Sequence, residues 1–255
     1  MLSHVDLDKA CEFYRSRFAD ASDLTFLFVG SFSPSEIRPL VEQYVASLPS
    51  TNSKVTWRDI GLRPPRGVIK KEVRKGIEPK SVVWIVFSGP SDWTEDTRTG
   101  LTGLSEVLRI KLREVIREEK GGTYGVSVGG YPIHYPTPEY RFSISFGCSP
   151  DRVEELVRTV FGQIDSLRNF PPDISYIAKV KETLRRGQET MLKQNQFWMS
   201  SLQFCLSNGE DPRSILAFEE RLQLITPEAV RRAAEKFLDP LNYVQVVLIP
   251  ETEKR

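Results

Sequence analysis

Two residues of this sequence, Arg117 and Tyr124, are suited to bind a carbonyl oxygen. They lie on either side of Gly121-Gly122, with the arginine expected in the last turn of a helix and the tyrosine at the start of a strand. Across such a turn a guanidinium and a phenol can converge on one space, and both donate hydrogen bonds. They could therefore assist at the carbonyl of a peptide lying along the strand. Structural roles are also open, because arginine is favoured near helix C-termini and tyrosine in strands.

The sequence offers few other groups for catalysis. His4 and His134 have no second histidine or glutamate at zinc-ligand spacing, so neither H-E-x-x-H nor H-x-x-E-H can be written. There is no G-x-S-x-G nucleophile motif and no phosphate-binding loop. Cys11, Cys148 and Cys205 are odd in number and far apart, which gives neither a disulfide framework nor a zinc pair. We therefore expect no catalytic residue, metal site or cofactor in this chain.

A helix and a strand must hold Arg117 and Tyr124 in place. Apolar residues at spacings of three and four predict a half-buried helix that ends at the two glycines. These residues are Leu101, Leu104, Val107, Leu108, Leu112, Val115 and Ile116. Alternation from Tyr124 onward predicts a strand over about 123–130. The alternating segment 140–146 is expected to be its antiparallel neighbour.

Further helices and strands are predicted on both sides of this region. Two helices are expected before it, over about 4–18 and 33–48, the second with a buried face of Ile37, Leu40, Val41, Tyr44, Val45 and Leu48. After residue 149 we expect long helices up to Gly209 with a break at Gly187 or 193–196, then helices over 213–222 and 226–237. The other strands are expected at 24–29, 68–73, 81–87 and 243–249. Antiparallel strands segregated from long helices predict an α+β fold, with an antiparallel sheet packed against long helices.

The same helix-strand pattern occurs at both ends of the chain. At one constant offset, Leu7, Ala10, Cys11 and Tyr14 align with Val230, Ala233, Ala234 and Phe237, and the strand 24–29 then aligns with 244–249. Residues 51–67 lack any sustained period, as a linker does. We interpret residues 1–50 as the tail of a preceding homologous module, 51–67 as a linker and 68–255 as a complete C-terminal module. A chance similarity between two helix-strand units is the alternative.

Composition excludes some partners. The 35 basic and 34 acidic residues are spread along the chain and give a net charge of +1, which provides no field to recruit nucleic acid. No apolar run reaches the roughly 18 residues that a membrane span needs, and the first residues do not resemble a signal peptide. We therefore expect no nucleic-acid partner and no membrane span, and the compartment stays unknown.

Three segments of the sequence resemble the pitrilysin/insulinase family of zinc metallopeptidases, the inverted zincins. They are the strand, glycine and helix of 24–37 with Leu48-Pro49, the strand ending Phe87-Ser88-Gly89-Pro90, and the Arg-Glu-x-x-Gly-x-x-Tyr pattern within 112–126. The resemblance covers nearly the whole chain. It implies a module like those of pitrilysin and mitochondrial processing peptidase.

The resemblance also implies a function. In such enzymes an earlier module carries the zinc ligands and the glutamate base, while a later module closes over the peptide with an arginine and a tyrosine, here Arg117 and Tyr124. Because H-x-x-E-H is absent, this chain is predicted to be inactive alone, with zinc only in the parent protein. We interpret it as the noncatalytic C-terminal portion of a zinc metalloendopeptidase, which closes the substrate chamber. The alternative is an inactive scaffold or partner subunit of a two-chain peptidase or processing complex.

The expected partners follow from this interpretation. They are a peptide or unfolded polypeptide substrate and a catalytic zinc-binding module, in the same parent chain or in a partner subunit. If residues 1–50 belong to a preceding module, the strand Leu24–Val29 is an apolar strand with open edges. We expect it to pack on the final module or to self-associate with another copy. For a bacterial parent, a periplasmic or exported location is left open.

Overall fold

The computed structural model describes residues 5–119 and 125–251. The chain forms two compact units. One unit comprises Met1–Asp59 and Met191–Glu210, here called the N-terminal unit, and the other comprises Ile60–Thr190 and Asp211–Arg255, here called the sheet unit. The division falls inside the predicted linker, and residues 51–66 have no regular secondary structure. The predicted module boundaries at residues 50 and 67 stay a prediction.

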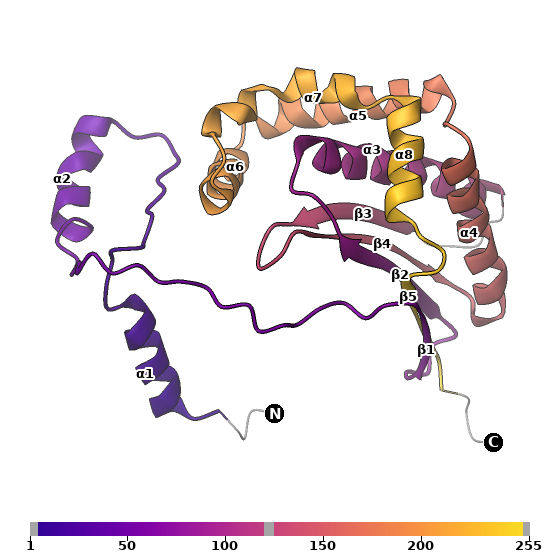
Figure 1. Cartoon of the computed structure of the whole chain (residues 1–255), viewed down its shortest axis with the longest axis horizontal. Coiled ribbons are helices and arrows are strands. Elements are labelled where there is room, and N and C mark those ends of the chain that lie inside the picture. Colours follow the sequence, from indigo (N-terminus) through magenta and orange to yellow (C-terminus); the bar gives the residue numbers. More distant parts are fainter. Residues whose placement is uncertain (1–4, 120–124, 252–255) are drawn as a thin grey trace. The chain divides into compact units, whose positions relative to one another are not determined.

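The sheet unit is built on five strands in the order β1-β5-β2-β4-β3 (Figure 1). They are β1 (Val68–Arg74), β2 (Ser81–Pro90), β3 (Val126–Ile133), β4 (Glu139–Cys148) and β5 (Tyr243–Ile249). The expected antiparallel pairing of the two strands after the long helix is confirmed, running from Val126 opposite Phe146 to Ile133 opposite Glu139. The expectation of an antiparallel sheet is wrong at one position, since β1 pairs with β5 in parallel. β1 is the edge strand and β5 lies beside it, although the other three strands and most of the helices come between them in the sequence.

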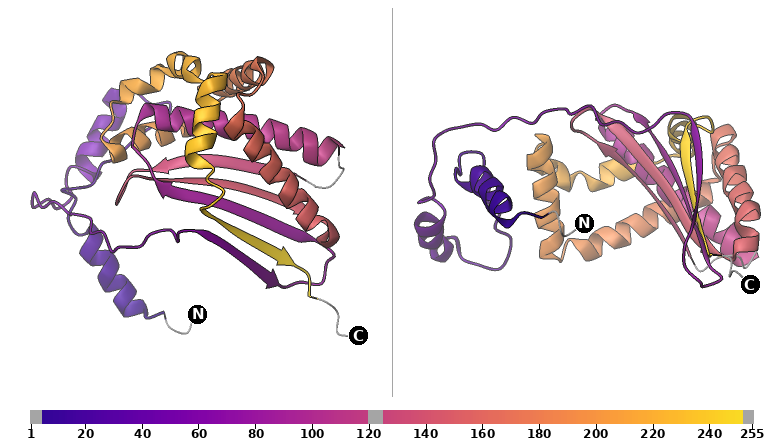
Figure 2. Two further views of the ribbon diagram at one scale, coloured as in Figure 1. Left: turned by 45° about the vertical axis from the view of Figure 1, so that its right-hand side comes forward. Right: turned by 90° about the horizontal axis from the view of Figure 1, so that it is seen from below.

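The helices of the sheet unit cover one face of the sheet, as Figures 1 and 2 show. They are α3 (Glu95–Leu112), α4 (Val153–Asn169), α5 (Ile174–Met191), α7 (Phe218–Leu224) and α8 (Pro227–Phe237). Alternate residues of β2 face them, so that Ile85 is fully buried while its neighbour Trp84 is 54% exposed on the opposite face. No helix in the described ranges is long and apolar enough to cross a membrane.

Capping residues fix several helix boundaries. The Thr226 hydroxyl accepts the Ala229 amide at 3.1 Å at the start of α8, with Pro227 in the first turn. The long helical stretch breaks at 192–194, which overlaps the polar segment 193–196 and not Gly187, and α6 (Asn195–Asn208) follows. Gly209, with φ of +69°, ends α6 in the left-handed conformation that glycine adopts freely. The short helix expected over 213–222 is divided into a 3₁₀ turn, Pro212–Leu216, and α7.

The N-terminal unit contains the predicted helices without the predicted burial. Asp6 caps α1 (Leu7–Phe18) by accepting the Lys9 amide, and α2 (Pro34–Tyr44) begins with Pro34 and ends before residue 48. Neither helix has a buried residue, so the buried face expected on the second helix is wrong, with Leu40 55% and Tyr44 65% exposed. The helical period of a sequence predicts which face could be buried, whereas burial also requires a neighbour.

The strand predicted at 24–29 is also wrong for this structure. Leu24–Val29 pairs with no strand in the described part of the chain, and Leu24, Phe26 and Phe28 are 39–48% exposed. A strand is stabilised by its hydrogen-bonded neighbours, so alternating apolar residues alone do not produce one. The equivalent segment at the other end of the chain, β5, has neighbours on both sides and forms a strand.

Close packing of β3 on β4 leads to a test of the sheet. A Cβ added at Gly130 would lie 2.5 Å from Cδ2 of Phe142, whereas a Cβ at Gly129 would meet nothing within 4 Å. We expect Gly130→Ala to lower the free energy of unfolding by about 1–3 kcal/mol because the fully buried Phe142 must move. Gly129→Ala is the matched control and should change it by less than about 0.5 kcal/mol. Urea denaturation of both variants measures the difference, and equal stabilities would contradict the close contact.

Candidate functional site

The segment that carries Arg117 has an unusual backbone. After Leu112 the helix α3 continues as a π-helical segment, Arg113–Glu119. Such segments are rare and occur frequently at functional sites. Leu112 and Ile116 are fully buried and fasten the inner side of this helix end to the core. The Arg117 side chain and all of Tyr124 lie outside the described residues, as does the glycine turn between them, so their convergence stays a prediction.

Contacts with α5 hold the π-helical segment. The Tyr176 hydroxyl donates to the Glu114 carboxylate at 2.6 Å, and Nζ of Lys179 lies 3.7 Å from the other carboxylate oxygen. Nζ of Lys111 and Nζ of Lys179 lie 4.9 and 5.4 Å from the centre of the Tyr176 ring. Two cations therefore lie near the ring, and its hydroxyl is bonded to an acid of the segment. This cluster fixes the backbone that presents Arg117.

A second contact ties the same helix to the strand that follows Tyr124. Nη2 of Arg109 donates to the carbonyl oxygen of Val128 in β3 at 3.0 Å, and Nη1 of Arg109 donates to Glu106 at 3.0 Å. Tyr124 precedes the first residue of β3, Val126, by two positions. Both sides of the glycine turn are thus anchored, one by Glu114 and the other by Arg109. The sequence did not single out either anchoring residue, since each is a polar residue on an amphipathic helix.

The comparison with protein families decides what kind of chain this is. The family described as "Peptidase M16 inactive domain" matches residues 4–184, which include the N-terminal helices, the linker, α3 and β3. The chain belongs to this family. The resemblance to pitrilysin-type zinc peptidases is confirmed, and so is the α+β fold class.

Similar proteins agree with M16 membership. The chain is 25% identical over 280 residues to "Zinc protease PQQL-like" of Arabidopsis thaliana, covering 99% of this chain and 29% of the relative. It is 23% identical over 242 residues to "Probable zinc protease PqqL" of Escherichia coli, covering 93% of this chain and 26% of the relative. The chain therefore spans less than a third of the length of these curated relatives.

Solved structures share the fold. The periplasmic protease PqqL from Escherichia coli superposes with a TM-score of 0.68 at 21% identity, over 87% of this chain and 25% of that one. A peptidase M16 inactive domain from Pseudomonas fluorescens superposes with a TM-score of 0.67 at 19% identity, over 88% of this chain and 53% of that one. At these identities the likeness shows the fold alone.

The M16 relatives named as zinc proteases raise the question of whether this chain could hold zinc. Within residues 5–119 and 125–251, no group of three or more His, Cys, Asp or Glu side chains could hold a metal ion. The His134 ring stacks on the Trp93 ring, with the ring centres 4.5 Å apart and the planes at 5°. The Tyr135 ring is tilted by 32° against it, with the ring centres 4.1 Å apart. Burial raises the pKa of the Cys148 thiol, which disfavours the thiolate that zinc binds. The described residues do not fit a zinc site, and His4 lies outside them.

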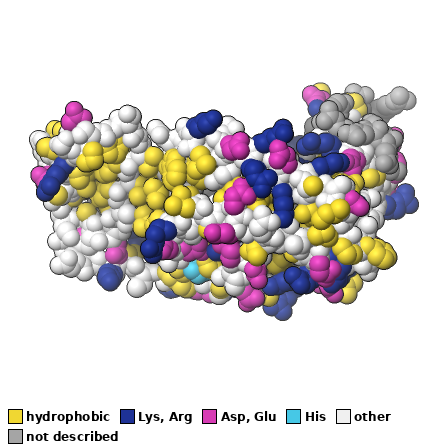
Figure 3. Space-filling model, turned by 90° about the horizontal axis from the view of Figure 1, so that it is seen from above, with side chains coloured by type: hydrophobic (Ala, Val, Ile, Leu, Met, Phe, Trp, Pro, Cys, Tyr) yellow, Lys and Arg dark blue, Asp and Glu magenta, His cyan; other side chains and the backbone are white. Residues whose placement is uncertain are grey.

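The described part of the surface carries charges of both signs. On the face shown in Figure 3, acidic and basic side chains are interspersed. Many of them form ion pairs, as Arg231 does with Glu228 at 2.8 Å and with Glu235 at 3.1 Å. Mixed charges favour solubility rather than binding of a polyanion.

Removal of a single hydroxyl group tests whether the Glu114 contact anchors the π-helical segment. Tyr176→Phe removes the hydroxyl that bonds the Glu114 carboxylate and keeps the ring that lies near the two lysines. We expect the free energy of unfolding to fall by about 1–2 kcal/mol, because a hydrogen bond to a charged group is lost. Tyr131→Phe removes a hydroxyl from a residue that is 48% exposed and serves as control. If thermal denaturation shows the same change for both variants, the Glu114 contact is not an anchor.

Proposed function

We propose that this chain is the noncatalytic C-terminal portion of a zinc-dependent metalloendopeptidase, in which it closes the substrate chamber. The observation that carries the proposal is the match to the M16 inactive domain over residues 4–184, in a chain whose sequence contains no H-x-x-E-H. In this role the chain supplies binding groups and leaves the hydrolytic chemistry to another module. Zinc is proposed only for the parent protein.

Arg117 and Tyr124 are the proposed peptide-binding residues. The guanidinium and the phenol would donate to a peptide carbonyl oxygen, which gains negative charge as it is attacked. Two observations support this role: the π-helical backbone at Arg117, and the anchors Glu114 and Arg109 on either side of the turn. Preorganised donors stabilise developing charge better than mobile ones, since they need no rearrangement during the reaction.

The partners proposed for this chain are a peptide or unfolded polypeptide substrate and a catalytic zinc-binding module. Residues 1–50 would be the tail of a preceding homologous module in the same parent chain. The comparison of α1 with α8 supports this assignment. Val230 and Phe237 of α8 are buried, whereas their equivalents in α1, Leu7 and Tyr14, are 73% and 62% exposed. The exposed apolar face of α1 is therefore suited to packing on a sheet, as the equivalent face of α8 does.

A second candidate function is an inactive scaffold or partner subunit of a two-chain peptidase or processing complex. Both candidates expect no metal site in this chain, so the lack of a fitting ligand group in the described residues does not separate them. The two candidates differ in the metal content of the purified parent protein. One zinc per parent chain would exclude the scaffold, and a parent without zinc would exclude the peptidase.

Turnover by the intact parent protein tests the proposed roles of Arg117 and Tyr124. We expect Arg117→Ala and Tyr124→Phe each to lower kcat by about 10²–10³-fold, as loss of one donor to a developing oxyanion does. Arg113→Ala, in the same π-helical segment and exposed, is the matched control and should keep its activity. The isolated chain should hydrolyse no peptide. Unchanged turnover in both test variants would remove the assigned roles.

We also propose that Leu24–Val29 mediates self-association when no preceding module covers it. Phe26 and Phe28 are exposed, and this apolar segment pairs with no strand in the described part of the chain. Sedimentation over a range of concentrations should show the chain associating, and Phe26→Asp with Phe28→Asp should return it to monomer. Phe170→Asp, at a residue 69% exposed in the sheet unit, is the control. A wild-type chain that is monomeric at every concentration would contradict this role.

A further inference from the structure

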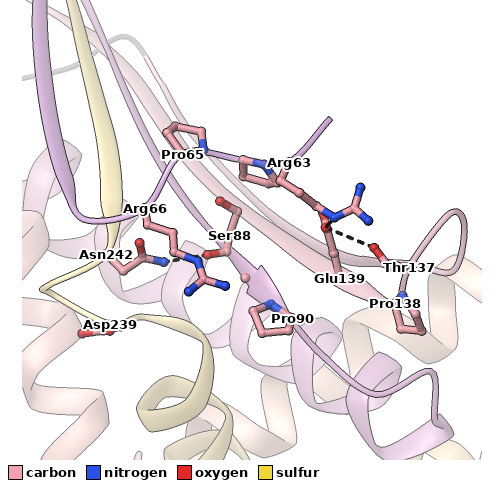
Figure 4. A pocket seen from close by; sticks show the side chains of 12 residues that line it. Arg63, Pro65, Arg66, Ser88, Pro90, Thr137, Pro138, Glu139, Asp239 and Asn242 are labelled. Carbon is pink, nitrogen blue, oxygen red and sulfur yellow. Dashed lines mark hydrogen bonds and ion pairs between the residues drawn. The ribbon is translucent and has the colours of Figure 1, made fainter. Parts of the chain in front are cut away.

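A pocket of about 540 Å³ lies at the end of the sheet where β2 ends and β4 begins (Figure 4). Four segments that are distant in sequence form it: 63–66 of the linker, 88–90 at the end of β2, 137–139 at the start of β4, and the loop from Asp239 to Asn242. All four belong to the sheet unit. Prolines make up much of the wall, namely Pro64, Pro65, Pro90 and Pro138.

Hydrogen bonds hold the walls of this pocket in place. The Asn242 side chain accepts the Gly67 amide at 2.8 Å and donates to the Ser88 carbonyl at 2.8 Å, which joins the linker to the end of β2. The Ser91 amide donates to the Pro138 carbonyl at 3.2 Å and closes the other side. Because these walls are already ordered, binding of a ligand does not carry the entropic cost of ordering them.

The charged side chains of the pocket are unequally engaged. Nε of Arg63 lies 3.5 Å from Glu139, whose carboxylate also accepts the Thr137 hydroxyl. The Asp239 carboxylate accepts the Leu241 amide at 2.9 Å. Arg66 makes no hydrogen bond or ion pair with any residue in the described part of the chain. In Figure 4 its guanidinium lies between Asn242 and Pro90.

We propose that this pocket binds a carboxylate of a peptide, with Arg66 as its partner. A planar guanidinium matches a carboxylate with two parallel hydrogen bonds. The proline rings contribute apolar walls without backbone N–H groups, and an ion pair gains strength beside apolar surface. Two arginines and two acids leave the lining neutral, which favours a single carboxylate over a phosphate-rich polyanion. The inference rests on the proposed function only in taking the ligand to be a peptide.

The test is direct binding of labelled peptides to the full chain, measured by fluorescence anisotropy at low salt. Three short peptides share one sequence: one has a central glutamate and an amidated C-terminus, one has glutamine there and is amidated, and one has glutamine and a free C-terminal carboxylate. We expect the amidated glutamine peptide to bind about tenfold more weakly than the better of the other two. Which carboxylate peptide binds better shows whether the pocket takes a side chain or a chain end.

Variants then assign the binding to this pocket. Arg66→Gln should abolish the advantage of the carboxylate peptide, and Arg66→Lys should keep part of it because the charge remains. Lys70→Gln removes one exposed positive charge of β1 outside the pocket lining and should leave the advantage intact. Added salt should reduce the advantage.

The proposal is overturned if the three peptides bind equally, or if Arg66→Gln and Lys70→Gln have the same effect. These outcomes are separate from those of the chamber role, because the latter is read from turnover by the Arg117 and Tyr124 variants. Equal binding of the three peptides, together with reduced turnover in those variants, would overturn the carboxylate-binding proposal and support the chamber role.

Discussion

Packing of α3 on β3 and α8, around a core shared with β2 and β4, is the interaction on which the rest of the sheet unit depends. Phe87 and Phe142 from the strands and Leu104 and Leu108 from the helix have no exposed surface, and each such side chain contributes about 1.5–3 kcal/mol relative to an exposed one. The same helix carries Arg109, Glu114 and the backbone of Arg117. The position of the candidate site is therefore determined by the core, since α3 cannot shift without opening it.

The elements nearest this core were the ones that the sequence predicted well. In β4 every second residue from Tyr140 to Cys148 is buried, so the alternation of the sequence is also the alternation of the structure. Thr226 caps α8, as a short polar residue before an apolar period should. The cap is a local interaction between residues three positions apart, and the alternation of β4 has a strand on each side to support it.

The features that sequence reasoning missed depend on groups far apart in the chain. Leu24–Val29 and β5 have nearly the same pattern, yet only β5 finds partners and becomes a strand. The π-helical turns after Leu112 continue an apolar period that reads as ordinary α-helix. The proline-walled pocket joins four distant segments, and the only sequence signals were Pro64-Pro65 and the strand ending Ser88-Gly89-Pro90. Arg117 and Tyr124 were selected by type and spacing, and their geometry stays a prediction.

The parallel pair of β1 and β5 has a consequence for how the chain is made. The neighbouring residues Gly67 and Asn242 bond across the start of this pair although 175 positions separate them in sequence. During synthesis, β1 and the edge of β2 that pairs with β5 have no strand partner until residues 243–249 have left the ribosome. Contacts of such high sequence separation form slowly, and unpaired strands are prone to aggregate meanwhile. The four charged residues of β1, Lys70, Lys71, Glu72 and Arg74, protect the strand during that interval, because charged side chains on an exposed edge discourage pairing with another nascent chain.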